Sequence, residues 1–216
     1  TTTNYNFEPA SGWTTSNAGS TGGLWTLGIR TIDPTWNYSP RNDADGSSRC
    51  YVTGNSPVTS DVSNGTVTLT SPVINLSAFA SGPTSNGAGA VLSYSYFLHI
   101  TAAGVTDVLL TEMSANDTAG PWIEVARENV SGSNHWRSRS ISQAQIQSAG
   151  LALTSTMRLR FRVTDGAPVA TYSVVEGGID AVRISDACDG TPALCSADVS
   201  GDGAVNIVDL LFIVSH

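Results

Sequence analysis

The chain has 216 residues, a formal net charge of −8, 40 % hydrophobic and 13 % charged residues, and no lysine. Five Trp and six Tyr, with many Val, Ile and Thr, exclude an intrinsically disordered chain. Ten arginines against eighteen acids argue against nucleic-acid binding, which needs a dense basic patch, and no apolar run approaches the roughly 18 residues of a membrane span.

Short segments of alternating apolar and polar residues, separated by turn residues, predict an all-β fold. In Met157–Val163 the apolar residues alternate with three arginines, so one face meets a core and the other meets water. Turn signals roughly every ten to fifteen residues favour an antiparallel β-sandwich of the jelly-roll type. The expected strands are Asn4–Glu8, Leu24–Arg30, Arg49–Thr53, Gly65–Leu76, Val91–Thr101, Asp107–Met113, Ile123–Glu128, His135–Ile141, Met157–Val163 and Glu176–Ile184, with a short helix over Ser142–Ala149.

The composition changes after Arg183, where no further basic residue occurs but five of the eighteen acids do. We therefore divide the chain into a sandwich (1–187), a linker (188–197) and a tail (198–216). Cys188 and Cys195 bound a short turn in the linker, where a disulfide forms in an oxidising compartment unless both remain free thiols. Cys50 is expected to be a buried thiol.

The tail carries the spacing of a calcium-binding loop. Oxygen ligands fall at positions 1, 3, 5, 9 and 12, a backbone carbonyl falls at position 7, and Gly203 stands at the sharp turn of position 6. The predicted Ca²⁺ ligands are Asp198, Ser200, Asp202, Ala204 (carbonyl), Asn206 and Asp209. The alternative is an acidic, glycine-rich turn without a metal ion.

This loop resembles the calcium-binding repeat of dockerins, which implies a calcium-loaded attachment element, although dockerins carry two such repeats and this chain has one. The residues that follow are apolar almost all round a helix, and such a helix is stable only when buried. The predicted assembly residues are Leu210, Leu211, Phe212, Ile213 and Val214. The tail is expected to dock on its own sandwich, on another copy of the chain or on a scaffold protein.

The sandwich offers a second possible metal site. Asp43 and Asp45 form a compact oxygen cluster in a turn, and Glu176 and Asp180 lie in the last strand. Glu176 and Asp180 are similar in type to residues that tie jelly-roll ends through Ca²⁺, which takes oxygen ligands. A solvated turn beside strand-end acids explains the same residues without a metal ion.

The arginine face of the clearest strand is a candidate ligand surface. Arg158, Arg160 and Arg162 could bind an anionic polysaccharide, with Trp136 or Trp122 stacking on sugar rings. A neighbouring Arg137 and Arg139 would extend the stripe. The alternative is a solvated sheet face in which these arginines pair with glutamates.

Four segments of the sandwich resemble the MAM-like, concanavalin-type jelly-roll modules of secreted bacterial proteins. These segments are Phe7–Trp13, Cys50–Asn55, Thr66–Ser77 and Val175–Ile184. The resemblance implies the fold and an extracellular place at a bacterial cell surface, but no reaction. A first residue other than Met suits a processed chain or a piece of a longer protein.

The sequence shows little sign of catalysis. His99 and His135 lie in strand-like segments without a nucleophile motif, and Glu112, Glu124 and Glu128 are explained as solvated acids as readily as by a glycosidase pair. We therefore predict a secreted, non-catalytic, calcium-binding protein for extracellular attachment or assembly, a role that includes a self-assembling surface fibre subunit. The alternative is a carbohydrate-binding accessory module of a secreted glycan-active enzyme or protease.

Overall fold

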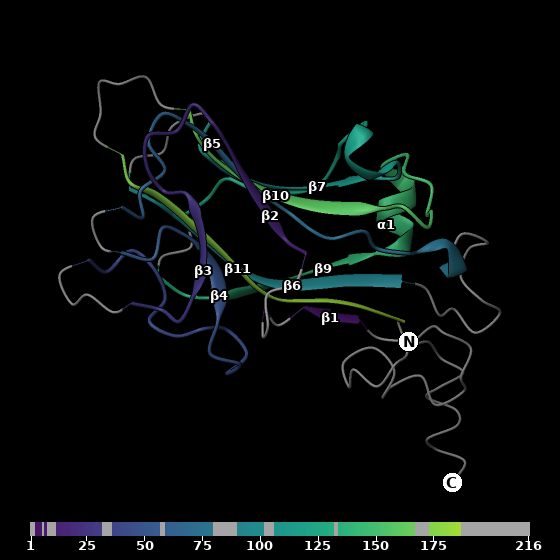
Figure 1. Cartoon of the computed structure of the whole chain (residues 1–216), viewed down its shortest axis with the longest axis horizontal. Helices are drawn as coiled ribbons and strands as arrows, with labels where there is room; N and C mark the ends of the chain where they lie inside the picture. Colours follow the sequence, from purple (N-terminus) through teal and green to yellow (C-terminus); the bar gives the residue numbers. More distant parts are fainter. Residues whose placement is uncertain are drawn as a thin grey trace, which may run out of the picture.

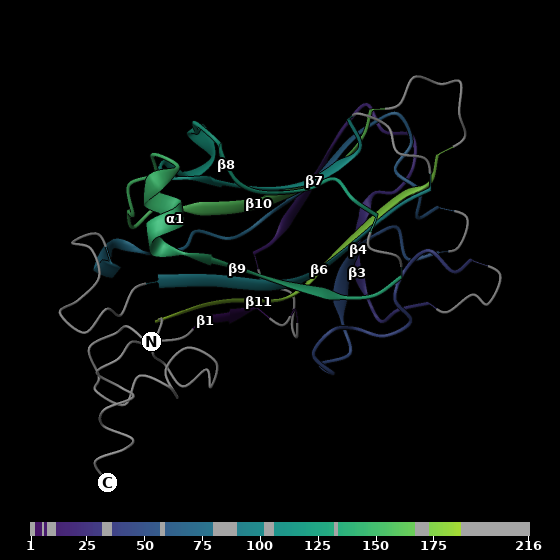
Figure 2. The same cartoon turned by 180° about the vertical axis from the view of Figure 1, so that it is seen from behind.

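The structure is a computed structural model, and it describes residues 3–5, 7, 12–31, 36–56, 59–79, 90–101, 106–131, 134–166 and 173–186. Two antiparallel sheets face each other across one core, as Figures 1 and 2 show from opposite sides. The predicted disulfide of Cys188 and Cys195, the calcium loop and the apolar tail lie outside the described residues. In the described part, no helix is long and apolar enough to cross a membrane.

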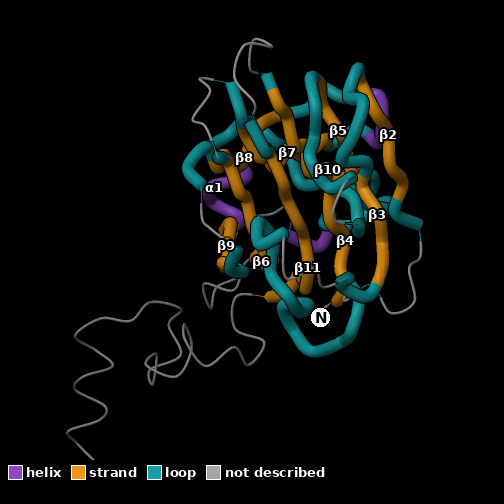
Figure 3. Tube along the Cα trace, turned by 90° about the vertical axis from the view of Figure 1, so that its left-hand side faces the viewer, coloured by secondary structure: helices purple, strands orange, loops and turns teal. Residues whose placement is uncertain are grey.

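Each sheet has a simple strand order, which Figure 3 shows as two layers. Sheet A runs β3-β4-β11-β6-β9, with β1 beside β11, and sheet B runs β2-β5-β10-β7-β8. The strands of sheet A are β1 (Thr3–Tyr5), β3 (Trp25–Gly28), β4 (Cys50–Thr53), β6 (Ala90–Ile100), β9 (Arg137–Ser142) and β11 (Val175–Asp186). Those of sheet B are β2 (Thr14–Ala18), β5 (Gly65–Thr70), β7 (Val108–Ser114), β8 (Ile123–Glu128) and β10 (Arg158–Asp165).

The remaining elements are short. The α-helix α1 (Gln143–Ser148) begins at a capping box in which the Ser142 side chain accepts from the Gln145 backbone N–H. Two 3₁₀ turns, η1 (Ser77–Phe79) and η2 (Asp117–Ala119), follow β5 and β7. The predicted all-β sandwich and the short helix are therefore confirmed.

The sequence misplaced the end of one long strand and missed another strand. The strand expected over Gly65–Leu76 ends at Thr70, because Pro72 lacks the N–H that a ladder needs; Ile74 makes only an isolated bridge to Met157. Strand β2 was not predicted, since its five residues are all exposed and show no alternation.

The core lies between the sheets and is built from alternate positions of their strands. In β10 the residues Leu159, Phe161 and Val163 are fully buried while the arginines between them are half-buried. The Phe161 ring contacts Trp13 and Tyr94, at centroid distances of 6.2 and 5.0 Å. This confirms the alternation predicted for the strand.

Strand β11 contains a bulge at its centre. Its register against β6 changes by one residue between Asp180, opposite Ser95, and Arg183, opposite Ser93. Ala181 adopts a φ of +48°, which is unusual for a residue with a side chain. Before the bulge β11 pairs with β4, and after it with β1.

The outer face of sheet A is covered by the segment between β3 and β4, which lies along the lower side of the molecule in Figure 1. Beneath it, Cys50, Val52 and Phe97 form a small second apolar cluster, with Trp136 packed against it. Cys50 is a free thiol and is fully buried, as predicted. Burial raises its pKa to about 12.

Gly178 is required where β11 crosses Phe97. The two residues are directly opposite in register, and a Cβ on Gly178 would lie 2.2 Å from Cε1 of Phe97. We expect Gly178→Ala to reduce stability by about 1–3 kcal/mol in urea unfolding, because the ring must move. In a Phe97→Leu background the same change should cost less, and an equal cost in both backgrounds would contradict this explanation.

Candidate functional site

Three carboxylates meet at the bulge of β11. Asp43 and Asp45 lie in the turn that precedes β4, and Asp180 is the last residue before the bulge; their oxygen atoms all lie within 4.8 Å of one another. Asp180 is fully buried, Asp43 is half-buried and Asp45 is exposed. The predicted grouping of these three residues is therefore present in the fold.

Backbone N–H groups hold the three side chains in place. Asp180 accepts from Ala44 N at 2.7 Å and from Ala181 N at 2.8 Å. Asp43 accepts from Ser48 N at 3.0 Å, and Asp45 accepts from Ser47 N at 2.9 Å. The bulge contributes directly, because Ala181 is one of the donors to Asp180.

The cluster is electrostatically costly without a cation. Burial raises the pKa of Asp180 to about 7, and the negative charges of Asp45 and Asp43 contribute to the rise. A hard divalent cation such as Ca²⁺ binds oxygen ligands of this kind. The donor set fits such an ion, and the exposed Asp45 leaves one side open for backbone or water oxygens.

Glu176 lies in a different environment from the other three predicted ligands. Its carboxylate accepts from Ser60 Oγ at 2.7 Å and from Trp36 Nε1. Glu176 and Asp180 share the outer face of β11, but four residues of strand separate them by about 13 Å, which is too far for one ion. Burial raises the pKa of Glu176, and hydrogen bonds from Ser60 and Trp36 and the charge of Arg30 oppose that rise.

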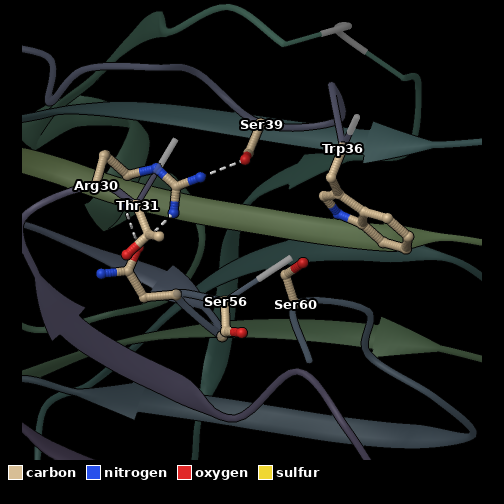
Figure 4. Close-up of a pocket in the computed structure, with 8 residues that line it drawn as sticks. Arg30, Thr31, Trp36, Ser39, Ser56 and Ser60 are labelled. Atoms are coloured by element: carbon tan, nitrogen blue, oxygen red, sulfur yellow. Dashed lines mark hydrogen bonds between the residues drawn. The ribbon is translucent and has the colours of Figure 1, made fainter. Parts of the chain in front are cut away.

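A polar notch adjoins Glu176, and Figure 4 shows the side chains around it. The Arg30 guanidinium donates to Asn55 Oδ1 at 2.9 Å, to the Pro40 carbonyl at 3.1 Å and to Ser39 Oγ. The notch has room for about one water, near 10 Å³. Its lining consists of Arg30, Thr31, Trp36, Ser39, Gly54, Asn55, Ser56 and Ser60. Sequence patterns carried no signal for this group, because its members are scattered over thirty positions without a motif.

The three arginines of β10 lie together on the outer face of sheet B and are paired with acids. Arg160 Nε donates to Glu112 Oε2 at 2.6 Å, Arg162 contacts the same carboxylate at 3.3 Å, and Arg158 pairs with Asp117. The Arg160 guanidinium carbon lies 4.1 Å from the centroid of the Trp122 ring. This arrangement matches the expected pairing with glutamate and places Trp122, of the two tryptophans considered, beside the stripe.

Trp136 lies on the other sheet. Its ring packs against Phe97 at a centroid distance of 5.2 Å on the outer side of sheet A. Arg137 and Arg139 belong to β9, also in sheet A, so they do not extend the stripe of β10. The residues proposed together as a ligand surface are therefore divided between two opposite faces.

The glutamates considered as a glycosidase pair are each bound to arginine. Glu112 is shared by Arg160 and Arg162, Glu124 pairs with Arg127, and Glu128 pairs with Arg139 and accepts from Tyr96. The hydrogen bond from Arg127 lowers the pKa of Glu124, whereas a general acid must hold a proton. The described residues therefore give these glutamates a structural role.

No family model matches the chain, and no curated protein matches it. Three solved structures illustrate what it is similar to. The cleaved adhesin domain K3 of Lys-gingipain from Porphyromonas gingivalis is 18 % identical, with a TM-score of 0.48 over 84 % of this chain and 95 % of that chain. The family 11 carbohydrate-binding module of a cellulosomal cellulase of Clostridium thermocellum is 10 % identical, with a TM-score of 0.46 over 83 % and 90 %.

The third is an enzyme, a Stig cyclase from Fischerella, which is 12 % identical with a TM-score of 0.42 over 84 % of this chain and 93 % of that chain. Identities of this order relate folds and not functions, and all three scores lie below 0.5. The two-sheet sandwich therefore rests on the strand order given above, and the function must be argued from the surfaces of the protein.

Proposed function

We propose that this chain is a secreted, non-catalytic module that binds an acidic polysaccharide on the outer face of sheet B. The observation that carries the proposal is the Arg160 guanidinium over the Trp122 ring, within a row of three arginines that share two carboxylates. Planar guanidinium and aromatic groups are suited to sugar rings and carboxylates.

Hydroxyl groups continue this surface toward the sheet edge. Cross-strand register places Thr14, Thr70 and Arg160 in one row and Ser16, Thr68 and Arg162 in the next. Directly opposite residues share a face, so these hydroxyls flank the arginines. In Figure 1 no further layer of described residues covers this face, whereas the segment before β4 covers the outer face of sheet A.

The charge balance of the row favours an acidic ligand. Arg158, Arg160 and Arg162 face Asp117 and Glu112, which leaves the row one positive charge in excess in a chain of net charge −8. Arg162 has the longest contact, at 3.3 Å, and keeps donors for a ligand carboxylate. An acidic polysaccharide therefore meets its most favourable surface here.

Native electrophoresis in gels that contain polygalacturonate tests the proposal. We expect the wild type to be retarded and Arg162→Ala to bind roughly tenfold more weakly, the effect of one charge-assisted hydrogen bond. Trp122→Ala should weaken the affinity by a similar factor, because it removes one aromatic contact. Arg137→Ala, which removes the same charge from sheet A, should change little. Equal retardation of all four proteins, or none, would overturn the assignment.

Ca²⁺ has a supporting role in this proposal. Bound at Asp43, Asp45 and Asp180, it would hold the segment before β4 against sheet A and neutralise charge that the fold otherwise concentrates there. The calcium loop of Asp198 to Asp209, the likeness to MAM-like and dockerin families, and an attachment or self-assembly role of the tail stay predictions. The tail residues lie outside the described part of the chain, and no family model supports the MAM-like or dockerin likeness.

A further inference from the structure

The outer side of sheet A carries three half-buried aromatic side chains, Trp36, Tyr38 and Trp136, which we call the aromatic ribbon. Tyr38 lies over His99, with ring centroids 4.7 Å apart, and Trp136 packs on Phe97. His99 and Phe97 are two residues apart in β6 and point to the same face, about 7 Å from each other. Tyr38 and Trp136 are therefore neighbours, and Trp36 meets Tyr38 edge-on at 4.9 Å.

Hydrogen bonds fix these rings. Trp136 Nε1 donates to the Asn42 carbonyl at 2.7 Å, and Trp36 Nε1 donates to the buried Glu176. The exposed amides of Asn134 and Asn37 join the two segments at 2.8 Å. A surface held in this way loses little conformational entropy when a ligand binds.

The ribbon ends at the polar notch of Figure 4, which Trp36 lines together with Ser39, Ser60 and, on the opposite side, Arg30. The notch has room for one water, so it admits a hydroxyl group but not a ring. Each of the three Arg30 nitrogens already donates a hydrogen bond within the protein. The charge of Arg30 is opposed by the nearby Glu176, so the notch offers mainly hydroxyl and amide groups to a ligand.

We infer that the aromatic ribbon is a second glycan-binding surface and that its ligand is a neutral polysaccharide. The C–H faces of the sugar rings would pack on the aromatic side chains. One sugar hydroxyl would occupy the notch in place of a water molecule. Glu176 lies on the same side of the sheet, and Asp43, Asp45 and Asp180 keep a formal charge of −1 even with Ca²⁺ bound, which disfavours an acidic chain.

This inference does not rest on the proposed function, because the two surfaces lie on opposite sheets. The large aliphatic side chains that the described residues expose, Leu24, Ile29, Val73 and Val130, are not part of the ribbon. A ribbon of rings and amides without exposed aliphatic residues suits a sugar better than a protein partner, whose interface cores are more apolar.

Native electrophoresis in separate gels of hydroxyethylcellulose, soluble xylan, galactomannan and laminarin tests the inference. We expect the wild type to be retarded in at least one gel, and Tyr38→Ala to bind about five- to tenfold more weakly, in line with the loss of one aromatic contact. Tyr38→Phe keeps the ring and should retain most of the affinity.

Trp122→Ala is the matched control, since it removes an aromatic ring from sheet B and should leave neutral-glycan binding unchanged. Tyr38→Ala should likewise leave retardation by polygalacturonate unchanged, which separates a failure of this surface from a failure of the first. If Tyr38→Ala does not fold, Asn37→Ala provides a second test, because it changes only an exposed amide beside the aromatic ribbon. This variant should still bind measurably more weakly than the wild type. No retardation of the wild type in all four gels, or equal retardation of wild type and folded variants, would overturn the inference.

Discussion

Calcium should raise the melting temperature of the wild-type protein by about 5–10 °C when its concentration is a hundred times the dissociation constant. A ligand that binds only the folded state at that ratio adds about 2.7 kcal/mol, and each kcal/mol shifts the melting temperature of a chain this size by roughly 2–4 °C. The reason is the cluster of Asp43, Asp45 and Asp180, where three carboxylates meet and one is fully buried. Scanning calorimetry with calcium and with a chelator measures the shift.

Two variants separate this site from the calcium loop predicted in the tail. Asp180→Asn should abolish the shift of the sandwich transition, because it removes the buried ligand. Asp202→Ala changes the tail loop and should leave that shift in place while lowering the total calcium bound. A full shift in Asp180→Asn would show that calcium stabilises the protein elsewhere.

Without calcium, the same cluster should make the protein less stable as pH rises from about 4 to about 7. The pKa of Asp180 is about 7 in the folded protein, against 3.8 for the unperturbed group, so the folded state binds this proton more tightly than the unfolded state. The contribution of protonated Asp180 to stability is complete below the pKa of the unfolded state and is lost as pH rises through the pKa of the folded state. This difference between the folded and unfolded pKa values of Asp180 corresponds to roughly 4 kcal/mol in the free energy of unfolding.

Urea unfolding in a chelator isolates this contribution from other titrating groups. Asp180→Asn cannot ionise, so it should be more stable than the calcium-free wild type at pH 7.5 and close to it at pH 4. Glu176→Gln should show the same trend, because burial also raises the pKa of Glu176. If the free energies of unfolding of the wild type and Asp180→Asn differ by the same amount at pH 4 and at pH 7.5, the assignment is contradicted.

Local patterns predicted the strands well where one face is buried. Met157–Val163 alternates cleanly and forms most of β10, and the short helix expected over Ser142–Ala149 is α1. Strand β2 gave no such signal, since its five residues are all exposed and pairing with β5 alone holds it in the sheet. A strand with one buried face can therefore be predicted from its alternating sequence. An exposed strand, held only by backbone hydrogen bonds, has no such pattern and is missed.

The candidate sites depended on long-range pairing, which local patterns do not contain. Asp43 and Asp180 are far apart in the sequence and meet because β4 and β11 are neighbours. Arg160 and Trp136 were grouped by chemistry alone, yet β10 and β9 belong to opposite sheets. Residue type predicted what each surface could bind, but strand order decided which residues share it.

The bulge at Ala181 serves the carboxylate cluster and is not needed for the packing of the core. Ile179, Val182 and Ile184 are all buried, while β6 runs past them with one residue fewer. Without Ala181 the strand would alternate regularly, Val182 would lie opposite Tyr94, and the same side chains would still enter the core. Ala181 is thus an insertion that the sandwich does not require, kept at a strained φ while its N–H donates to Asp180. In a shorter β11 the sandwich could persist as a scaffold whose last strand no longer shapes an ion site.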